Sequence, residues 1–205
     1  MASNSTPKKL RVGVMLEAVQ FSDVIGMDIL GTLSHWYMDQ VKEVEYSKWE
    51  ALKDHAMDIE FLYIATTLEP TFITPGLHFV PTVTYDSCPR DLDILLIGGP
   101  LPSHRPPQAD KFLKEAWAKT RVVLTTCTGG IWLASAGVLD GKKCTTNRGF
   151  LDMAKQLYPK TEWLDQRWVI EEKPFDGEGK GELWTSGGAG AGECECFIEA
   201  GERTN

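Results

Sequence analysis

One cysteine of this sequence, Cys127, stands where a nucleophile belongs in an α/β protein. Residues 122–126 before it are β-branched and apolar, which is typical of a buried parallel strand. Residues 128–136 after it are small or apolar on every side, which predicts a buried helix that ends before Gly141. A sharp strand-to-helix corner holds a side chain above the sheet, as in a nucleophile elbow. The chemistry that this arrangement offers is covalent attack by a thiolate on an electrophilic carbon.

The predicted helix start next to Cys127 also bears on the acidity of its thiol. A helix N-terminus offers unpaired N–H groups and a partial positive charge, and both favour the thiolate. We therefore expect the pKa of Cys127 to be lowered. The alternative is a packing role, because most free cysteines are buried and inert. The strand–Cys–Thr–Gly–Gly–helix context favours the reactive role.

A thiolate nucleophile needs a group that stabilises developing negative charge and a group that moves protons. The backbone N–H groups of Thr128 and Gly99 are candidates for an oxyanion hole, with Gly98 beside them. The carboxylates of Asp23 and Glu17 are the candidates for proton transfer. Asp23 is equally well explained as the N-cap of a helix, and the two glycines as a tight turn.

Alternating strands and helices must position these groups. Apolar runs predict strands at residues 10–16, 59–65, 77–83, 92–97, 122–126, 143–147, 168–171 and 183–186. Helical spacing predicts helices at residues 23–38, 109–119, 128–136 and 149–157, with further helical character towards residue 198.

This alternation predicts a doubly wound, mostly parallel α/β sheet with helices on both faces, a flavodoxin-like sandwich. We expect residues 10–205 to form a single domain after a polar tail at residues 1–9. Ligands of such sheets bind at the carboxyl ends of the strands, where Asp23, Gly99 and Cys127 all fall.

The composition of the chain limits the kinds of partner that it can bind. The 205 residues carry a net charge of −8, which disfavours nucleic acid and anionic membrane surfaces. We see neither a signal peptide nor an apolar run of the ~20 residues that a membrane span needs, so we expect a cytoplasmic protein. The five cysteines show no zinc spacing, and we expect no metal and no cofactor.

Four segments carry a family resemblance: VGVMLEAVQFSDVIGMDILG, LDILLIGGP, TTCTGGIWLASAGVLDGKKCTTN and LWTSGGAGAG. The sequence resembles the ThiJ/PfpI superfamily, which shares the class I glutamine amidotransferase-like fold. Within it, the sequence is most similar to the isonitrile hydratase-like branch, which also has a threonine after the cysteine. The resemblance implies that Cys127 is the elbow nucleophile and that Asp23 is the carboxylate beside it.

The departures from the family pattern exclude some activities. Met27 and Ile97 replace family prolines, and Asn147 replaces the histidine of a frequent Thr-Thr-His segment. Thr128 stands where peptidase and glyoxalase-type relatives have a histidine. The late His-x-Glu of glutamine amidotransferases is absent, since the last histidine is His104. Neither of those Cys–His schemes is therefore available.

The resemblance implies a cofactor-free hydratase or lyase in which the Cys127 thiolate attacks an isocyanide-like carbon and Asp23 moves protons. The alternative is a redox-sensing or stress-response protein in which Cys127 is oxidised without turnover. A sensing domain of a transcriptional regulator is a third option, and it would need a DNA-binding segment that we do not recognise. Relatives of this architecture commonly pair, so we expect a homodimer.

Overall fold

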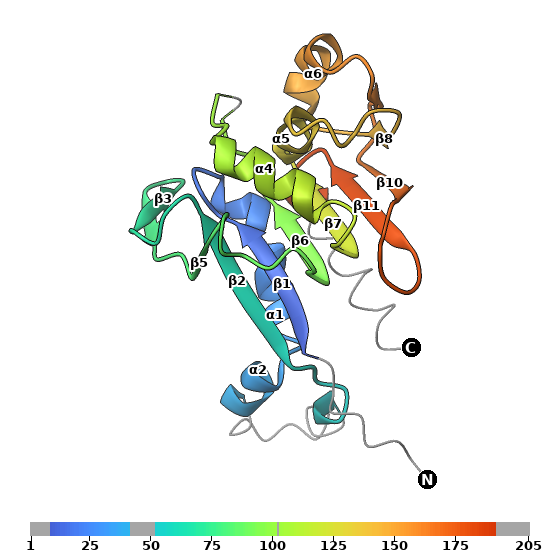
Figure 1. Ribbon diagram of the computed structural model, residues 1–205. Helices are drawn as coiled ribbons and strands as arrows, with labels where there is room; N and C mark the ends of the chain where they lie inside the picture. Colours follow the sequence, from blue (N-terminus) through green and yellow to red (C-terminus); the bar gives the residue numbers. More distant parts are fainter. Residues whose placement is uncertain (1–8, 42–51, 102, 192–205) are drawn as a thin grey trace.

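Seven strands form the central sheet of the computed structural model, which describes residues 9–41, 52–101 and 103–191. They are β1 (Leu10–Met15), β2 (Ile59–Ala65), β5 (Val83–Thr84), β6 (Ile94–Ile97), β7 (Val122–Thr126), β10 (Trp168–Lys173) and β11 (Gly181–Ser186). Their order is β10-β11-β7-β6-β1-β2-β5 (Figure 1). Only the β10–β11 pair of this sheet is antiparallel. The mostly parallel sheet that the sequence predicts is confirmed.

Helices cover both faces of this sheet. They are α1 (Gly26–Gly31), α2 (His35–Gln40), α4 (Pro107–Ala116), α5 (Gly129–Ser135) and α6 (Leu151–Leu157), with 3-10 turns η1 (Phe21–Val24) and η2 (Arg148–Phe150). Figure 1 shows α4 in front of the sheet and α1 behind it. Among the described helices, none is long and apolar enough to cross a bilayer. The layers are those of a doubly wound α/β fold.

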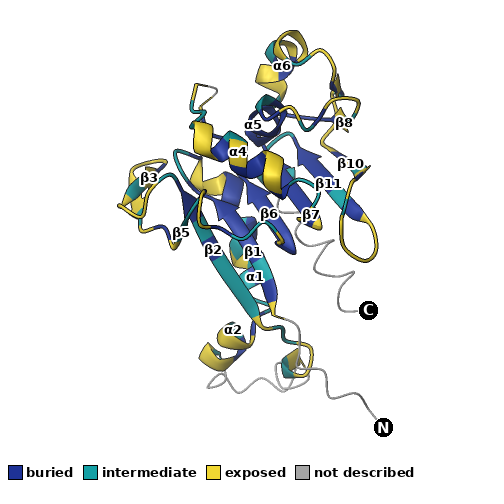
Figure 2. Cartoon of the chain, viewed as in Figure 1, coloured by how far each residue is buried: buried dark blue, intermediate teal, exposed yellow. Residues whose placement is uncertain are grey.

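The middle of the sheet is the apolar core. Every residue of β6 and β7 is buried, because helices cover both of their faces (Figure 2). Phe112 of α4 and Trp132 of α5 are fully buried members of the same core. The carboxyl ends of β1, β6 and β7 therefore project from a rigid base, which is what a precisely placed nucleophile needs.

The predicted helix over residues 23–38 is divided into η1, α1 and α2. Thr32 and Ser34 donate their hydroxyls to the carbonyls of Ile29 and Gly31 at 2.7 and 2.6 Å, which competes with helix continuation. The Ser34 hydroxyl then accepts from the Tyr37 N–H at 3.1 Å and caps α2. The prediction that Asp23 is an N-cap is wrong, because Asp23 lies inside η1 and caps no helix with its side chain.

Two predicted strands also differ in the structure. The strand predicted over residues 77–83 is two strands, β4 (Leu77–Phe79) and β5, separated by Pro81, which has no N–H for a ladder. β4 pairs with β3 (Thr71–Ile73) outside the main sheet. The strand predicted over residues 143–147 ends early as β8 (Lys143–Cys144), paired with β9 (Glu162–Trp163). The predicted helical end near residue 198, with Cys194 and Cys196, lies outside the described residues.

A buried cation joins β10 to the end of α4. Lys173 is only 4% exposed, and its ammonium donates to the carbonyls of Trp117, Thr120 and Pro174 at 2.6, 2.5 and 3.0 Å. Trp117 is the residue that ends α4, and its ring centroid lies 5.0 Å from the ammonium. A cation at a helix C-terminus is favoured by the helix dipole, and the ring face adds to this.

We predict that Lys173→Met lowers the free energy of unfolding by about 1–2 kcal/mol, because three carbonyls lose their donor. The loss is partly offset, since burial lowers the pKa of Lys173 to about 8 and the buried charge is itself costly. Urea unfolding followed by tryptophan fluorescence measures the change. Lys180→Met is the control, since Lys180 pairs with Glu172 on the surface and should leave stability unchanged. Equal effects of the two substitutions would contradict the prediction.

Candidate active site

The site is built around the backbone corner at Cys127. Its φ is +57°, a left-handed conformation that costs a non-glycine residue of the order of 1–3 kcal/mol. Three hydrogen bonds hold this corner: the Cys127 N–H donates to the Ser186 carbonyl at 3.0 Å, and its carbonyl accepts from the Asn147 N–H at 3.2 Å and the Thr146 hydroxyl at 2.8 Å. The sharp turn predicted between β7 and α5 is therefore present and is supported from two other segments.

Two glycines allow the parts of the site to approach one another. A Cβ at Gly129 would collide with the Ile97 carbonyl, so only glycine lets α5 start against the end of β6. A Cβ at Gly99 would lie 2.7 Å from Asp23 Oδ2 and 2.8 Å from the Thr128 nitrogen. Gly99 is thus the point where the carboxylate and the elbow meet. Gly98 packs against Val24 and Val19 instead.

Asp23 is a buried carboxylate, 4% exposed, beside the Cys127 sulfur. Its Oδ2 accepts the Gly99 N–H at 3.2 Å, and hydrogen bonding from Cys127 also favours the ionised carboxylate and so lowers its pKa. Burial raises the pKa of Asp23 to about 6, against the opposing effect of these two hydrogen bonds. The Gly99 N–H, expected as an oxyanion donor, is therefore engaged in holding the carboxylate.

The acidity of Cys127 differs from the sequence-based expectation. Burial raises the pKa of its thiol, and the negative charge of Asp23 raises it further. The Asn147 amide and the Thr128 N–H donate to the sulfur and lower the pKa, but they do not outweigh burial. The expected lowering of this pKa is wrong for that reason. A protonated thiol hydrogen-bonded to Asp23 has its base in contact, ready to take the proton as the sulfur attacks.

Asn147 is the residue of the site that the sequence analysis missed. Its Nδ2 lies 3.4 Å from Cys127 Sγ, and its Oδ1 accepts the Gly149 N–H at 3.0 Å. The available signal was its position after Thr145 and Thr146, where we noted an absent histidine. An asparagine amide is also a hydrogen-bond donor, so the position keeps a polar contact to the sulfur without a titrating ring.

Glu17 and His104 lie together in a second cluster. Glu17 Oε2 accepts the Thr66 N–H at 3.1 Å and its hydroxyl at 2.7 Å, and His104 Nε2 lies 3.7 Å away. Burial alone would raise the pKa of Glu17, but His104 and Thr66 outweigh it and the pKa is lowered. The charge of Asp23 raises the pKa of Cys127, whereas Glu17 is not among the groups that shift it. Of the two candidate carboxylates, the structure brings Asp23 to the thiol.

A cavity of about 280 Å³ opens over the sulfur. Its lining includes Gly99, Cys127, Thr128 and Asn147, but not Gly98, together with Ala18, Gln20, Thr74, Pro100, Leu101 and Phe150. The Thr128 hydroxyl donates to the Pro100 carbonyl at 2.7 Å. The group of Thr128 that lowers the pKa of the Cys127 thiol is therefore its backbone N–H and not its hydroxyl. Leu101 and Phe150 give the mouth an apolar character. A small molecule with an apolar part fits this space.

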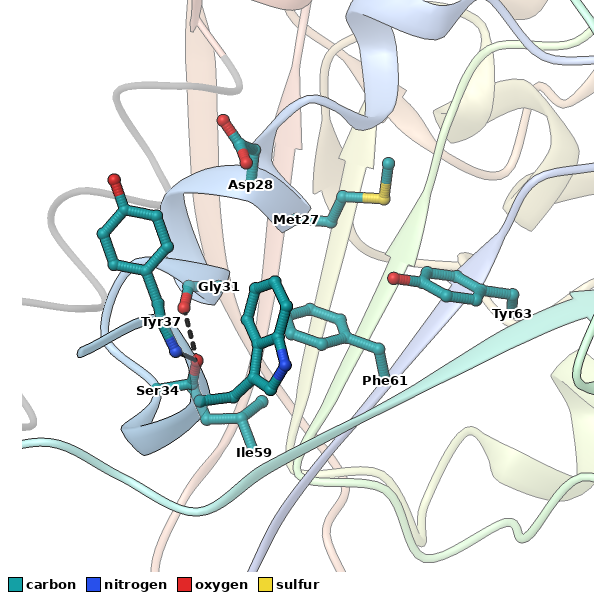
Figure 3. A pocket seen from close by; sticks show the side chains of 9 residues that line it. Met27, Asp28, Gly31, Ser34, Tyr37, Ile59, Phe61 and Tyr63 are labelled. Carbon is teal, nitrogen blue, oxygen red and sulfur yellow. Dashed lines mark hydrogen bonds between the residues drawn. The ribbon is translucent and has the colours of Figure 1, made fainter. Parts of the chain in front are cut away.

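A second cavity, of about 360 Å³, lies between α1, α2 and β2 (Figure 3). Aromatic rings dominate it, from Trp36, Tyr37, Phe61 and Tyr63. It has no cysteine or histidine, and its Ser34 hydroxyl is engaged with the Gly31 carbonyl and the Tyr37 N–H. Within the described ranges, no group of three or more His, Cys, Asp or Glu side chains gathers in a way that would hold a metal ion. The chemistry belongs to the cavity over Cys127.

A parallel α/β sheet that carries a buried cysteine on a strained elbow, with a carboxylate against the sulfur, defines a class of cysteine-elbow α/β proteins. Residues 36–192 match the DJ-1/PfpI family. The chain belongs to this family, as the resemblance of its motifs implied.

Individual relatives agree with this assignment. The chain is 31% identical over 103 residues to the isonitrile hydratase of Pseudomonas putida, and the match spans 49% of this chain and 45% of that protein. It therefore covers less than half the length of this curated relative.

Two solved structures share the fold. A ThiJ/PfpI family protein from Pseudomonas syringae has a TM-score of 0.68 at 19% identity, with 96% of this chain and 69% of that chain covered. DJ-1beta of Drosophila melanogaster has a TM-score of 0.65 at 15% identity, with 97% and 91% covered.

We predict that Asp23→Asn stabilises the protein at neutral pH. The folded-state pKa of about 6 lies above the ordinary 3.8, so the folded protein binds this proton more tightly and loses stability as pH rises through this window. A neutral amide that still accepts from Gly99 should raise the free energy of unfolding by about 1–3 kcal/mol near pH 7. The gain should shrink as pH falls towards 4, as urea unfolding across pH would measure.

Glu17→Gln is the matched control. The pKa of Glu17 is lowered in the folded state, so its ionised form is favoured by folding and the substitution should destabilise the protein at neutral pH. A loss of stability in Asp23→Asn that does not vary with pH would contradict the burial account of Asp23.

We predict that iodoacetamide modifies Cys127 before Cys88 and Cys144. Burial raises the pKa of both Cys88 and Cys144 to about 12, and neither lines the cavity above the elbow. The thiolate is the reactive form, and Cys127 has a base and two donors at its sulfur. Peptide mapping after timed labelling measures the order, with Cys127→Ser as the control. Faster labelling of Cys88 or Cys144 would overturn it.

Proposed function

We propose that this chain is a cofactor-free, cysteine-dependent hydratase that acts on a small electrophilic carbon of the isocyanide type. The observation that carries the proposal is the buried Asp23 carboxylate, held by the Gly99 N–H close enough to Cys127 for its charge to raise the pKa of the thiol, beneath a small, partly apolar cavity. The similarity to the isonitrile hydratase of Pseudomonas putida supports the choice of substrate class. An isocyanide has a compact reactive carbon and an apolar substituent, which suit the sulfur and the Leu101–Phe150 mouth of the cavity.

In the first step, the Cys127 S–H bond breaks and its proton passes to Asp23. The sulfur forms a bond to the terminal carbon of the isocyanide, and the carbon takes the proton back from Asp23. The product is a thioimidate, R–N=CH–S–Cys. The pKa of about 6 lets the Asp23 carboxyl both accept and return a proton near neutral pH.

In the second step, a water molecule adds to the thioimidate carbon. The ionised Asp23 accepts one water proton and delivers it to the nitrogen, which gives a tetrahedral adduct that carries a hydroxyl group. The carbon–sulfur bond then breaks, the Cys127 thiolate leaves, and the hydroxyl proton returns to the sulfur through Asp23. An N-substituted formamide, R–NH–CHO, is released, and the net change is the addition of one water.

The alternative function is redox sensing, with Cys127 oxidised to a sulfenic or sulfinic acid and no turnover. Redox-sensing cysteines are typically exposed and have a low pKa. Cys127 is 7% exposed and its pKa is raised, so these observations favour the hydratase.

We predict that Asp23→Asn lowers the hydration rate of a simple alkyl isocyanide by a factor of ~10² or more, the usual scale for loss of general acid–base help. Formamide release, followed by chromatography, measures it. Glu17→Gln should retain turnover, because Glu17 serves Thr66 and His104 rather than the sulfur. Cys127→Ser should abolish it.

The pH profile provides a second readout of the same prediction. Because the base form of Asp23 is needed, kcat/KM should fall as pH drops below about 6, and this acid limb should be absent from Asp23→Asn. Full turnover in Asp23→Asn together with its loss in Glu17→Gln would exchange the roles of the two acids. Failure of every isocyanide, with both variants changing only the oxidation rate of Cys127, would favour redox sensing.

A further inference from the structure

Asn147 contacts the sulfur in a single defined orientation. Its Nδ2 faces Cys127 Sγ at 3.4 Å, while its Oδ1 accepts the Gly149 N–H at 3.0 Å. A backbone N–H can only donate, so a flipped amide would set two donors against each other at Gly149. The donor end of the amide is therefore the end that faces the sulfur.

The same residue is tied to the elbow through its backbone. The Asn147 N–H donates to the Cys127 carbonyl at 3.2 Å, and Asn147 is the N-cap of η2. Asn147 is therefore fixed through its backbone to Cys127 and through its side chain to the start of η2. Its side chain needs no rearrangement to meet the sulfur, which is the condition for preorganised stabilisation of charge.

Three groups meet the sulfur, and they differ in what they do with protons. Asn147 donates its amide to the sulfur at 3.4 Å, and its effect together with that of the Thr128 N–H lowers the pKa of the thiol, whereas the Asp23 carboxylate raises it. The two donors strengthen when the sulfur becomes an anion, because hydrogen bonds to charged groups exceed those to neutral ones. Neither donor titrates near neutral pH. Only Asp23 exchanges protons with the sulfur.

We propose that Asn147 is a catalytic residue of this site, whose amide N–H stabilises the Cys127 sulfur anion when the S–H proton has passed to Asp23. No proton moves to or from Asn147 in this step: the S–H bond breaks, Asp23 gains the proton, and the sulfur keeps the electron pair. The same donor assists when the thiolate leaves the tetrahedral adduct. That role in turnover rests on the function proposed above, whereas stabilisation of the sulfur anion does not.

Alkylation of Cys127 by iodoacetamide, measured against pH in the full chain, tests the proposal without any substrate. Asn147→Ser keeps an acceptor for the Gly149 N–H and adds no charge, but its shorter side chain removes the donor from the sulfur, and Asn147→Ala removes both. We expect both variants to react about tenfold or more slowly than wild type near neutral pH. A role confined to capping η2 would slow Asn147→Ala and leave Asn147→Ser near the wild-type rate, which would overturn the proposal.

Asn147→His is the third variant, because it returns a donor that titrates near pH 6.5. Its alkylation profile should gain a second titration step in this range, beside the one that Asp23 gives the wild-type profile. Arg148→Ala is the control, since this neighbouring side chain is 80% exposed and pairs with Asp165 at the surface. Thermal unfolding of each variant reports any loss of the fold, and Asn147→Ser decides the outcome if Asn147→Ala does not fold.

The remaining outcomes separate this proposal from the proposed function. If the variants react as expected but wild type hydrates no isocyanide, the function fails and the stabilisation of the sulfur anion stands. If wild type hydrates isocyanides and Asn147→Ser retains both its kcat and its alkylation rate, Asn147 is not catalytic and the proposed function stands.

Discussion

The site depends on one electrostatic contact, between the Cys127 thiol and the buried carboxylate of Asp23. A carboxylate in this position needs a donor of its own, and the Gly99 N–H supplies it. Gly99 must be a glycine because a side chain there would occupy the space of the carboxylate and the elbow. The buried Asp23 carboxylate therefore requires a glycine, Gly99, after β6, and it lies beside Cys127, which follows the neighbouring strand β7.

The site is also a local source of instability. A left-handed Cys127 and a buried ionisable acid both cost free energy, and sites of this kind persist only when the surrounding fold holds them. Here the fully buried strands β6 and β7 and the hydrogen bonds from Ser186 and Thr146 hold the corner. Stability and reactivity are opposed at Asp23, since the proposed base is the group whose neutral replacement should stabilise the fold.

The arrangement differs from a Cys–His pair in the charge it presents to the sulfur. A histidine would bring a proton and a positive charge that vary with pH, whereas Asn147 offers a neutral donor at every pH. The His104 ring instead lies beside Glu17 and meets the Trp132 ring edge-on at 5.6 Å. Proton movement at the sulfur is thereby assigned to a single carboxyl, which suits a reaction that adds water without a change of oxidation state.

The local sequence pattern was sufficient to predict β1, β2, β7 and the elbow, because the apolar residues of a buried strand or helix follow one another along the chain. Asp23 was identified as a candidate, but its partner was not, since Asp23 and Gly99 are 76 positions apart. The family resemblance already pointed to Asp23 rather than Glu17, but the contact of Asn147 with the sulfur and the raised pKa of Cys127 were decided only by the tertiary structure. Burial and long-range contacts set these properties, and neither can be predicted from the residues adjacent to the cysteine.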